Sequence, residues 1–165
     1  MQTVLIALFF LNLLVLVIYD FKYKAVPDYL LLVALFLSFF ISEYSFIDSL
    51  KNAFFISGAF ILLNFVVTFY IQNIKSRFLK DESLKTKTAL GEGDIPLIAS
   101  FAIIVGLEEV IFLVFLSALL AIVLYIYRVK RFKDGEIPFI PPLAVAFLLE
   151  YFLNLSIFFK GLFWD

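Results

Sequence analysis

The chain contains no cysteine and no histidine among its 165 residues. Disulfides, iron–sulfur clusters, haem ligation by histidine and zinc sites built from Cys or His are therefore excluded. Catalysis by Ser-His or Cys-His pairs is excluded for the same reason. Any hydrolytic chemistry has to rely on Asp, Glu, Lys, Ser or Tyr, and we expect neither a cofactor nor a metal.

Charged residues are also scarce, at 16% of the chain, whereas 64% of the residues are hydrophobic and 23 are Phe. The mean hydropathy of +1.08 is far too high for a soluble domain. The net charge of −1 gives no reason to expect a nucleic acid as partner. The composition predicts an all-α, polytopic membrane protein whose surroundings are a lipid bilayer.

Six apolar runs divide the chain, and we interpret them as six transmembrane helices of a single domain, residues 1–165. A helix needs roughly 17 to 25 residues to cross a hydrocarbon layer of about 30 Å, so two of the runs are short. The first run is not read as a signal peptide, because no basic residue precedes it and no small-residue cleavage site follows. The predicted spans are about residues 3–19, 29–41, 53–71, 95–107, 110–127 and 137–159.

The basic residues indicate the orientation of these spans. Loops rich in Lys and Arg stay on the cytoplasmic side. With the N-terminus outside, the loops 20–28, 72–94 and 128–136 are cytoplasmic and hold every basic residue except Lys51 and Lys160. The two short runs could instead be re-entrant hairpins, but if only the second were re-entrant, the basic loop 72–94 would face outward, so six spans is the better prediction.

A polar segment, Gly91-Glu92-Gly93-Asp94, stands at the entrance to the fourth predicted span. Asp94 has a structural interpretation as the N-cap of a helix whose first turn includes Pro96. In a functional interpretation, Gly91 and Gly93 remove side-chain bulk, so that an extended substrate can approach the carboxylate closely. Alone, the motif is weak and the structural interpretation is favoured.

Asp20 gives this segment a partner. It ends the first predicted span, next to Lys22 and Lys24, and the topology brings it to the same membrane face as Asp94. Two neighbouring carboxylates partly out of water repel as anions, so they are expected to share a proton and to titrate with separated apparent pKa values. The ionised member can activate water while the protonated one polarises a carbonyl. The pair therefore suggests aspartyl protease chemistry.

The other acidic residues are given structural roles. Asp28, after Pro27, is interpreted as the N-cap of the second span. Glu108 and Glu109 are expected in a solvated turn between the fourth and fifth spans. Glu150 lies inside the sixth run, where an acid is costly and usually paired or functional.

These residues resemble the type IV prepilin peptidases, membrane aspartyl proteases of the Gly-x-Gly-Asp class. The likeness consists of Asp20 followed by Pro27-Asp28, of Gly91 to Asp94, and of the six-span layout. A weaker third element is the segment 137–144, Ile-Pro-Phe-Ile-Pro-Pro-Leu-Ala, which is similar to the family's Pro-Phe-Gly-Pro segment. Pro96 stands where the family often has Lys, and Ile140 replaces the Gly.

The resemblance implies a peptidase in the bacterial inner membrane with its active site facing the cytoplasm. Asp20 and Asp94 would be the catalytic pair, supported by Gly91, Gly93, Pro27 and Asp28. The substrates would be prepilins or type II secretion pseudopilins, whose short basic leader is removed at the cytoplasmic end of a hydrophobic helix. Without Cys, the chain is similar to members that lack the methyltransferase region with its zinc-binding loop.

Two alternatives remain open. The presenilin and signal-peptide-peptidase group shares Tyr-Asp and Gly-x-Gly-Asp, although its members are larger and carry a Pro-Ala-Leu element that is missing here. The second alternative is a small transporter or assembly subunit, in which Asp20, Asp94 and Glu150 would bind a cation or relay protons.

Overall fold

The computed structural model describes residues 2–75, 91, 93–132 and 138–163, and the regular secondary structure of this part of the chain is helical, without a strand. The prediction of an all-α fold is confirmed. The elements are α1 (Gln2–Tyr23), α2 (Asp28–Ile41), α3 (Phe46–Phe69), the π-helical segment η1 (Tyr70–Lys75), α5 (Asp94–Val105), α6 (Leu107–Phe132), α7 (Ile140–Leu153) and α8 (Leu155–Phe163).

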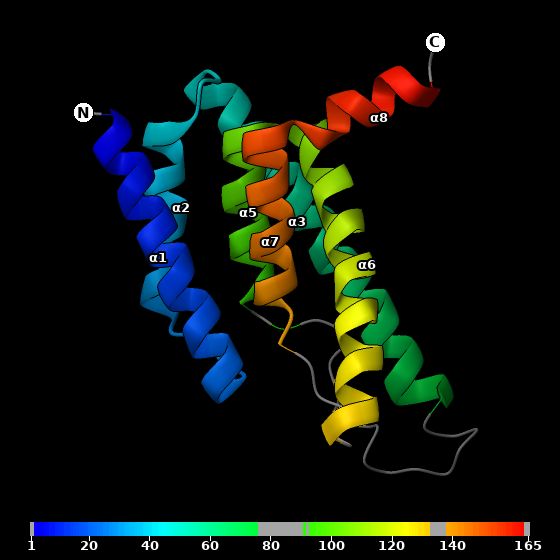
Figure 1. The fold of residues 1–165 in the computed structure, drawn as a ribbon. Coiled ribbons are helices and arrows are strands. Elements are labelled where there is room, and N and C mark those ends of the chain that lie inside the picture. Colours follow the sequence, from blue (N-terminus) through cyan, green and yellow to red (C-terminus); the bar gives the residue numbers. More distant parts are fainter. Residues whose placement is uncertain (1, 76–90, 92, 133–137, 164–165) are drawn as a thin grey trace.

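Helix α5 lies at the centre of the bundle (Figure 1). It packs against α2, α3, α6 and α7, and every residue from Leu97 to Ile104 is buried. Between α5 and α7, the Phe101 and Phe147 rings stack at 4.1 Å between centroids, and Phe9 of α1 packs edge-on against Phe101. A short helix that is apolar all round is suited to such a central place, because it has no lipid-facing surface to cover.

Three helices are long and apolar enough to cross a membrane on their own: Gln2–Tyr23, Phe46–Asn73 and Leu107–Tyr127. The helices Asp28–Ile41, Asp94–Val105 and Ile140–Leu153 are apolar but shorter. The chain is thus a membrane protein, and the six-span count and the orientation stay predictions. At 14 residues, α2 extends only about 21 Å, which is less than the hydrocarbon thickness of about 30 Å.

Several helices extend beyond the predicted spans, whose boundaries in the membrane stay predictions. Helix α1 continues past Asp20 to Tyr23 and ends where Lys24 adopts a left-handed conformation with φ of 52°. Glu108 and Glu109 lie in the first turn of α6 instead of a loop, and α6 runs on to Phe132 through part of the predicted loop 128–136. Charged residues are tolerated in the end turns of a helix that projects beyond the apolar layer, so the apolar runs underestimate the helices.

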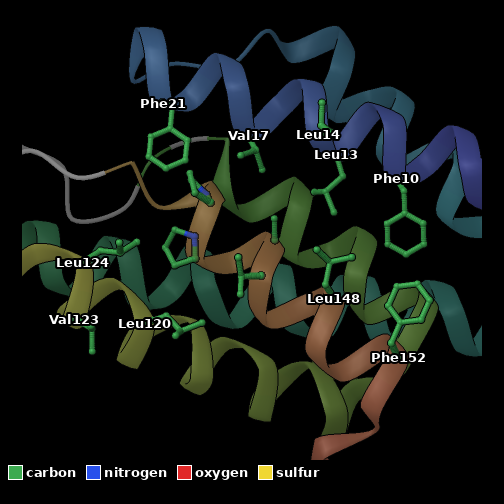
Figure 2. A pocket seen from close by; sticks show the side chains of 14 residues that line it. Phe10, Leu13, Leu14, Val17, Phe21, Leu120, Val123, Leu124, Leu148 and Phe152 are labelled. Atoms are coloured by element: carbon green, nitrogen blue, oxygen red, sulfur yellow. The ribbon is translucent and has the colours of Figure 1, made fainter. Parts of the chain in front are cut away.

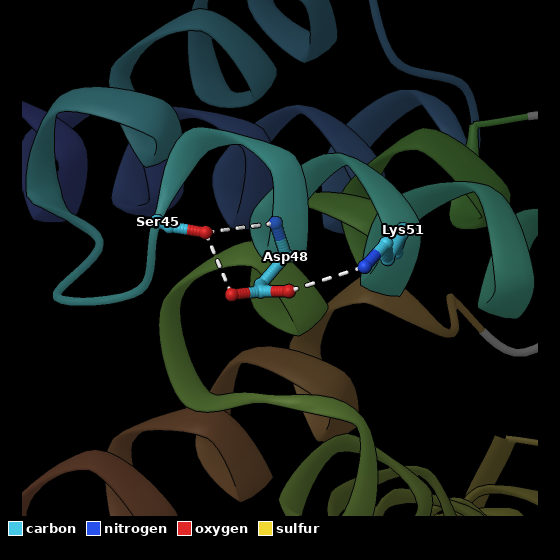
Figure 3. A network of polar contacts seen from close by, with 3 residues as sticks. All are labelled: Ser45, Asp48 and Lys51. Carbon is cyan, nitrogen blue, oxygen red and sulfur yellow. Dashed lines mark hydrogen bonds and ion pairs between the residues drawn. The ribbon is translucent and has the colours of Figure 1, made fainter.

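Helix α3 begins seven residues before the predicted span 53–71 because a cap fixes its start (Figure 3). The Ser45 hydroxyl oxygen accepts a hydrogen bond from the Asp48 amide at 3.2 Å, and its hydroxyl donates to the Asp48 carboxylate at 2.6 Å. Lys51 forms an exposed ion pair with Asp48 at 3.5 Å. This cap satisfies the Asp48 amide, one of the amide groups at the helix start that have no partner within the helix.

The apolar run 137–159 is not one helix. It breaks at Asn154, which has φ of 46° and ψ of 49° and separates α7 from α8. The Glu150 carboxylate is 2% exposed and accepts hydrogen bonds from the Ser156 amide at 3.0 Å and from the Ser156 hydroxyl. Glu150 therefore finds a partner inside the chain, and it satisfies an amide at the start of α8.

Candidate active site

Asp20 lies in the last turn of α1 with only 7% of its surface exposed. Its Oδ2 accepts a hydrogen bond from the backbone amide of Ile140, the first residue of α7, at 3.0 Å. The first amide groups of a helix have no partner within it, so a carboxylate at this place satisfies one of them and meets the positive end of the helix dipole. The third sequence element, residues 137–144, thus contacts Asp20 directly.

Asp94 is the first residue of α5 and is 8% exposed. Its amide donates to the Gly91 carbonyl at 3.2 Å, and the Gly91 backbone hydrogen-bonds to the Asp94 carboxyl. A Cβ on Gly91 would stand 3.0 Å from Asp94 Oδ2, so the absence of a side chain lets the backbone fold closely over the carboxyl group. The N-cap residue is Gly93, so the interpretation of Asp94 as an N-cap is wrong by one position.

Gly93 is the point at which the Gly-x-Gly-Asp segment touches the turn between α1 and α2. A Cβ on Gly93 would lie 2.6 Å from Val26 Cγ2 and 3.3 Å from Leu31 Cδ1. The φ and ψ of Gly93, −74° and −20°, are open to any residue, so glycine is needed here for space and not for its backbone freedom. This contact sets how closely Asp94 approaches the segment that follows Asp20.

The two aspartates come together at one end of the bundle, where α1 ends and where α5 and α7 begin (Figure 1). Asp20 is close enough to Asp94 for the two carboxyl groups to interact electrostatically. Helix α2 packs against both α1 and α5, and α7 packs against both as well, so the pair is held by two bridging helices. The topology predicted this juxtaposition.

Pro27 and Asp28 form the start of α2. Pro27 is the N-cap of α2, with φ of −69° and ψ of 131°, and Asp28 is the first helical residue with an exposed side chain. No side chain caps this helix, so the interpretation of Asp28 as an N-cap is wrong. The carboxylate still lies in the first turn, where the helix dipole favours a negative charge.

Two features of the site were not found from the sequence. One is the Ile140 amide as a donor to Asp20, because the segment 137–144 was selected only for its likeness to a family motif. The other is the packing of Val26 on Gly93. The Pro141-Pro142 pair could have pointed to the Ile140 amide, because prolines are typical of a helix start and the amides there need an acceptor.

The arrangement offers two largely buried carboxyl groups on separate helices, at the end of an apolar bundle. Within the described residues, no group of three or more His, Cys, Asp or Glu side chains gathers as a metal site would require. A carboxylate can accept a proton from water and a carboxyl group can donate one to a carbonyl oxygen.

Comparison with known proteins agrees with this geometry. The model of the type IV leader peptidase family matches residues 7–126, which include both aspartates and the Gly-x-Gly-Asp segment. No curated protein and no solved structure matches the chain significantly. The matched region is well over half of the chain, and it extends from α1 into α6. The chain therefore belongs to the type IV leader peptidase family.

Proposed function

We propose that the chain is an aspartyl endopeptidase that removes the leader from prepilin-type substrates at a membrane surface, with Asp20 and Asp94 as the catalytic residues. The observation that carries the proposal is that two acids, each less than a tenth exposed, lie close together. They belong to different helices and are 74 residues apart in the sequence. The family to which the chain belongs consists of leader peptidases. The substrates would be prepilins or type II secretion pseudopilins.

The reaction uses one proton shared by the pair. The ionised carboxylate takes a proton from water, whose oxygen attacks the scissile carbonyl carbon, while the protonated carboxyl group donates to the carbonyl oxygen. As the tetrahedral intermediate collapses, one hydroxyl group returns a proton to the carboxylate that had donated one, the C–N bond breaks, and the leaving amine takes the proton that came from water, which restores the singly protonated pair. Either aspartate can fill either role.

The site would face the cytoplasm of a bacterium at its inner membrane. This follows from six spans with the N-terminus outside, which puts the ends of α1, α5 and α7 near Asp20 on the side of the basic loops. The basic residues of the loop 72–94 support this orientation, and most of them fall in the segment 76–90, which lies outside the described residues. Water reaching a polar site at the membrane surface would supply the second substrate.

A transporter or assembly subunit has weaker support. That alternative needs Glu150 as a residue that binds ions or protons along a pathway. The carboxylate is instead bonded to Ser156 at the corner between α7 and α8, which gives it a structural task. Asp20 and Asp94 lie at the other end of α7 from this corner (Figure 1).

The test is cleavage of a prepilin by the purified chain in detergent, followed as a loss of leader mass. Asp20→Asn and Asp94→Asn should each lower the rate by about 10² to 10⁴-fold, the usual contribution of general acid–base catalysis. Asp48→Asn is the control, since Asp48 is an exposed acid at the start of α3. Cleavage that persists in either site variant would refute the pair.

A further inference from the structure

An apolar groove of about 670 Å³ lies between α1, α6 and α7 (Figure 2). On α1, its wall is made by side chains at a helical spacing of three and four residues, which together form a single stripe along one side of the helix. These are Phe10, Leu13, Leu14, Val17 and Phe21. Asp20 follows Leu13 by seven residues and Val17 by three, so the stripe leads along the helix to the aspartate.

The opposite wall leads to the same carboxylate. On α7 the lining begins at Pro141 and Pro142 and continues through Leu148 to Phe152. Pro141 follows Ile140, whose amide donates to Asp20. Prolines have no amide hydrogen, so the first turn of α7 presents no unpaired donor to the groove. Both walls are therefore apolar until they meet at the aspartate.

The length of the groove fits a helix. From Phe10 to Phe21 on α1 and from Pro141 to Phe152 on α7, each wall covers eleven residue steps, or about 16 Å along the helix axis and about three helical turns. Leu120, Val123 and Leu124 of α6 close the third side. A helix laid in a groove of this kind is recognised through residues at spacings of three, four and seven.

We propose that this groove holds the apolar helix of the substrate, with the peptide bond to be cut at the Asp20 end. The inference rests on the leader peptidase function proposed above and specifies how that substrate binds. The occupant is a peptide helix because residues on either side of Asp20 on α1, and Pro141 next to its partner Ile140 on α7, line the groove, so that a chain lying in it passes beside the proposed site of cleavage. Affinity would come from side-chain packing along α1 and α7.

The test uses two leucines on the same helix. Leu14 lines the groove and Leu11 does not, and their exposed fractions are similar, 55% and 60%. Leu14→Trp, which fills the groove, should lower kcat/KM for prepilin cleavage about tenfold, mainly by raising KM, because the larger side chain leaves too little room for the substrate helix. Leu11→Trp should stay within about twofold of the unsubstituted chain.

Cross-linking tests the same contact with a gentler change. Since the chain has no cysteine, Leu14→Cys introduces a unique thiol. In the Asp94→Asn background, which retains the substrate uncut, oxidation should join this thiol to a cysteine in the apolar helix of the substrate. Leu11→Cys should form about tenfold less of this disulfide.

The outcomes separate the two proposals. If the unsubstituted chain cleaves prepilin but the substitutions at positions 14 and 11 behave alike in both assays, the groove proposal is wrong and the peptidase proposal stands. An acyl chain as occupant would give this result. Disulfide-linked dimers of Leu14→Cys that exclude substrate would make a second copy the occupant and also overturn the proposal. If the unsubstituted chain cleaves no prepilin, both proposals fall.

Discussion

Replacing Gly93 by alanine tests whether the packing of the Gly-x-Gly-Asp segment sets the site. The new Cβ would stand 2.6 Å from Val26 Cγ2, whereas ordinary contacts are 3.4 Å or longer, so the neighbour has to move by about 0.8 Å. The new Cβ cannot move toward Leu31 instead, because Leu31 is only 3% exposed and its Cδ1 would already lie 3.3 Å away. The backbone of Gly93 is in the right-handed helical region, so the effect is purely steric.

Overfilling of this kind costs about 1 to 3 kcal/mol. Val26 lies six residues after Asp20 on the turn that follows α1, so a shift of this turn displaces one aspartate relative to the other. A misplacement of about 1 Å can lower a rate about 10²-fold. We expect Gly93→Ala to reduce prepilin cleavage by about 10 to 100-fold while the protein remains folded.

The assay is cleavage in detergent alongside thermal unfolding. Gly58→Ala is the matched control, because a Cβ on Gly58 in α3 meets nothing within 4 Å and should leave cleavage unchanged. The double substitution Gly93→Ala with Val26→Ala removes the clashing methyl group and should recover much of the activity. Full activity of Gly93→Ala, or no recovery in the double variant, would refute the reasoning.

Three further predictions concern the acids and their partners. Cleavage should pass through a maximum with pH, falling on the acid side because both Asp20 and Asp94 become protonated and on the alkaline side because both become ionised; a flat profile would contradict a shared proton. Glu150→Gln should leave cleavage within about twofold, whereas a loss as large as in the aspartate variants would favour ion transport. Ser156→Ala removes one donor to buried Glu150 and should lower the unfolding temperature by about 2 to 4 °C for each kcal/mol lost, with about 1 kcal/mol expected.

Much of the candidate site could be predicted from one physical rule, that apolar runs alternate in direction across a bilayer. The rule brings the end of the first helix and the start of the fourth apolar run to the same side, and the structure has Asp20 and Asp94 together there. It does not require the two helices to touch, and α2 and α7 in fact bridge them.

What could not be predicted depends on tertiary contacts. The run 137–159 is apolar apart from a few polar residues, so hydropathy did not show the break at Asn154, where the left-handed turn brings Ser156 back to bond with Glu150. The groove likewise exists only where side chains of three helices fail to fill the space between them. Asp28 was expected as a cap because of its residue type, but Pro27 took that position and leaves the carboxylate exposed.

The hydrogen bond between Asp20 and Ile140 joins residues 120 positions apart, and this has a consequence for biosynthesis. At about 5 to 20 residues per second, a ribosome needs roughly 6 to 24 s to travel from one codon to the other. During that interval the nascent chain already carries Asp20, and later Asp94, but lacks the amide that holds Asp20 in place. The order of synthesis thus leaves the Asp20 carboxylate without this donor until residue 140 has been made, so the proposed catalytic pair cannot be fully positioned before α7 begins to form.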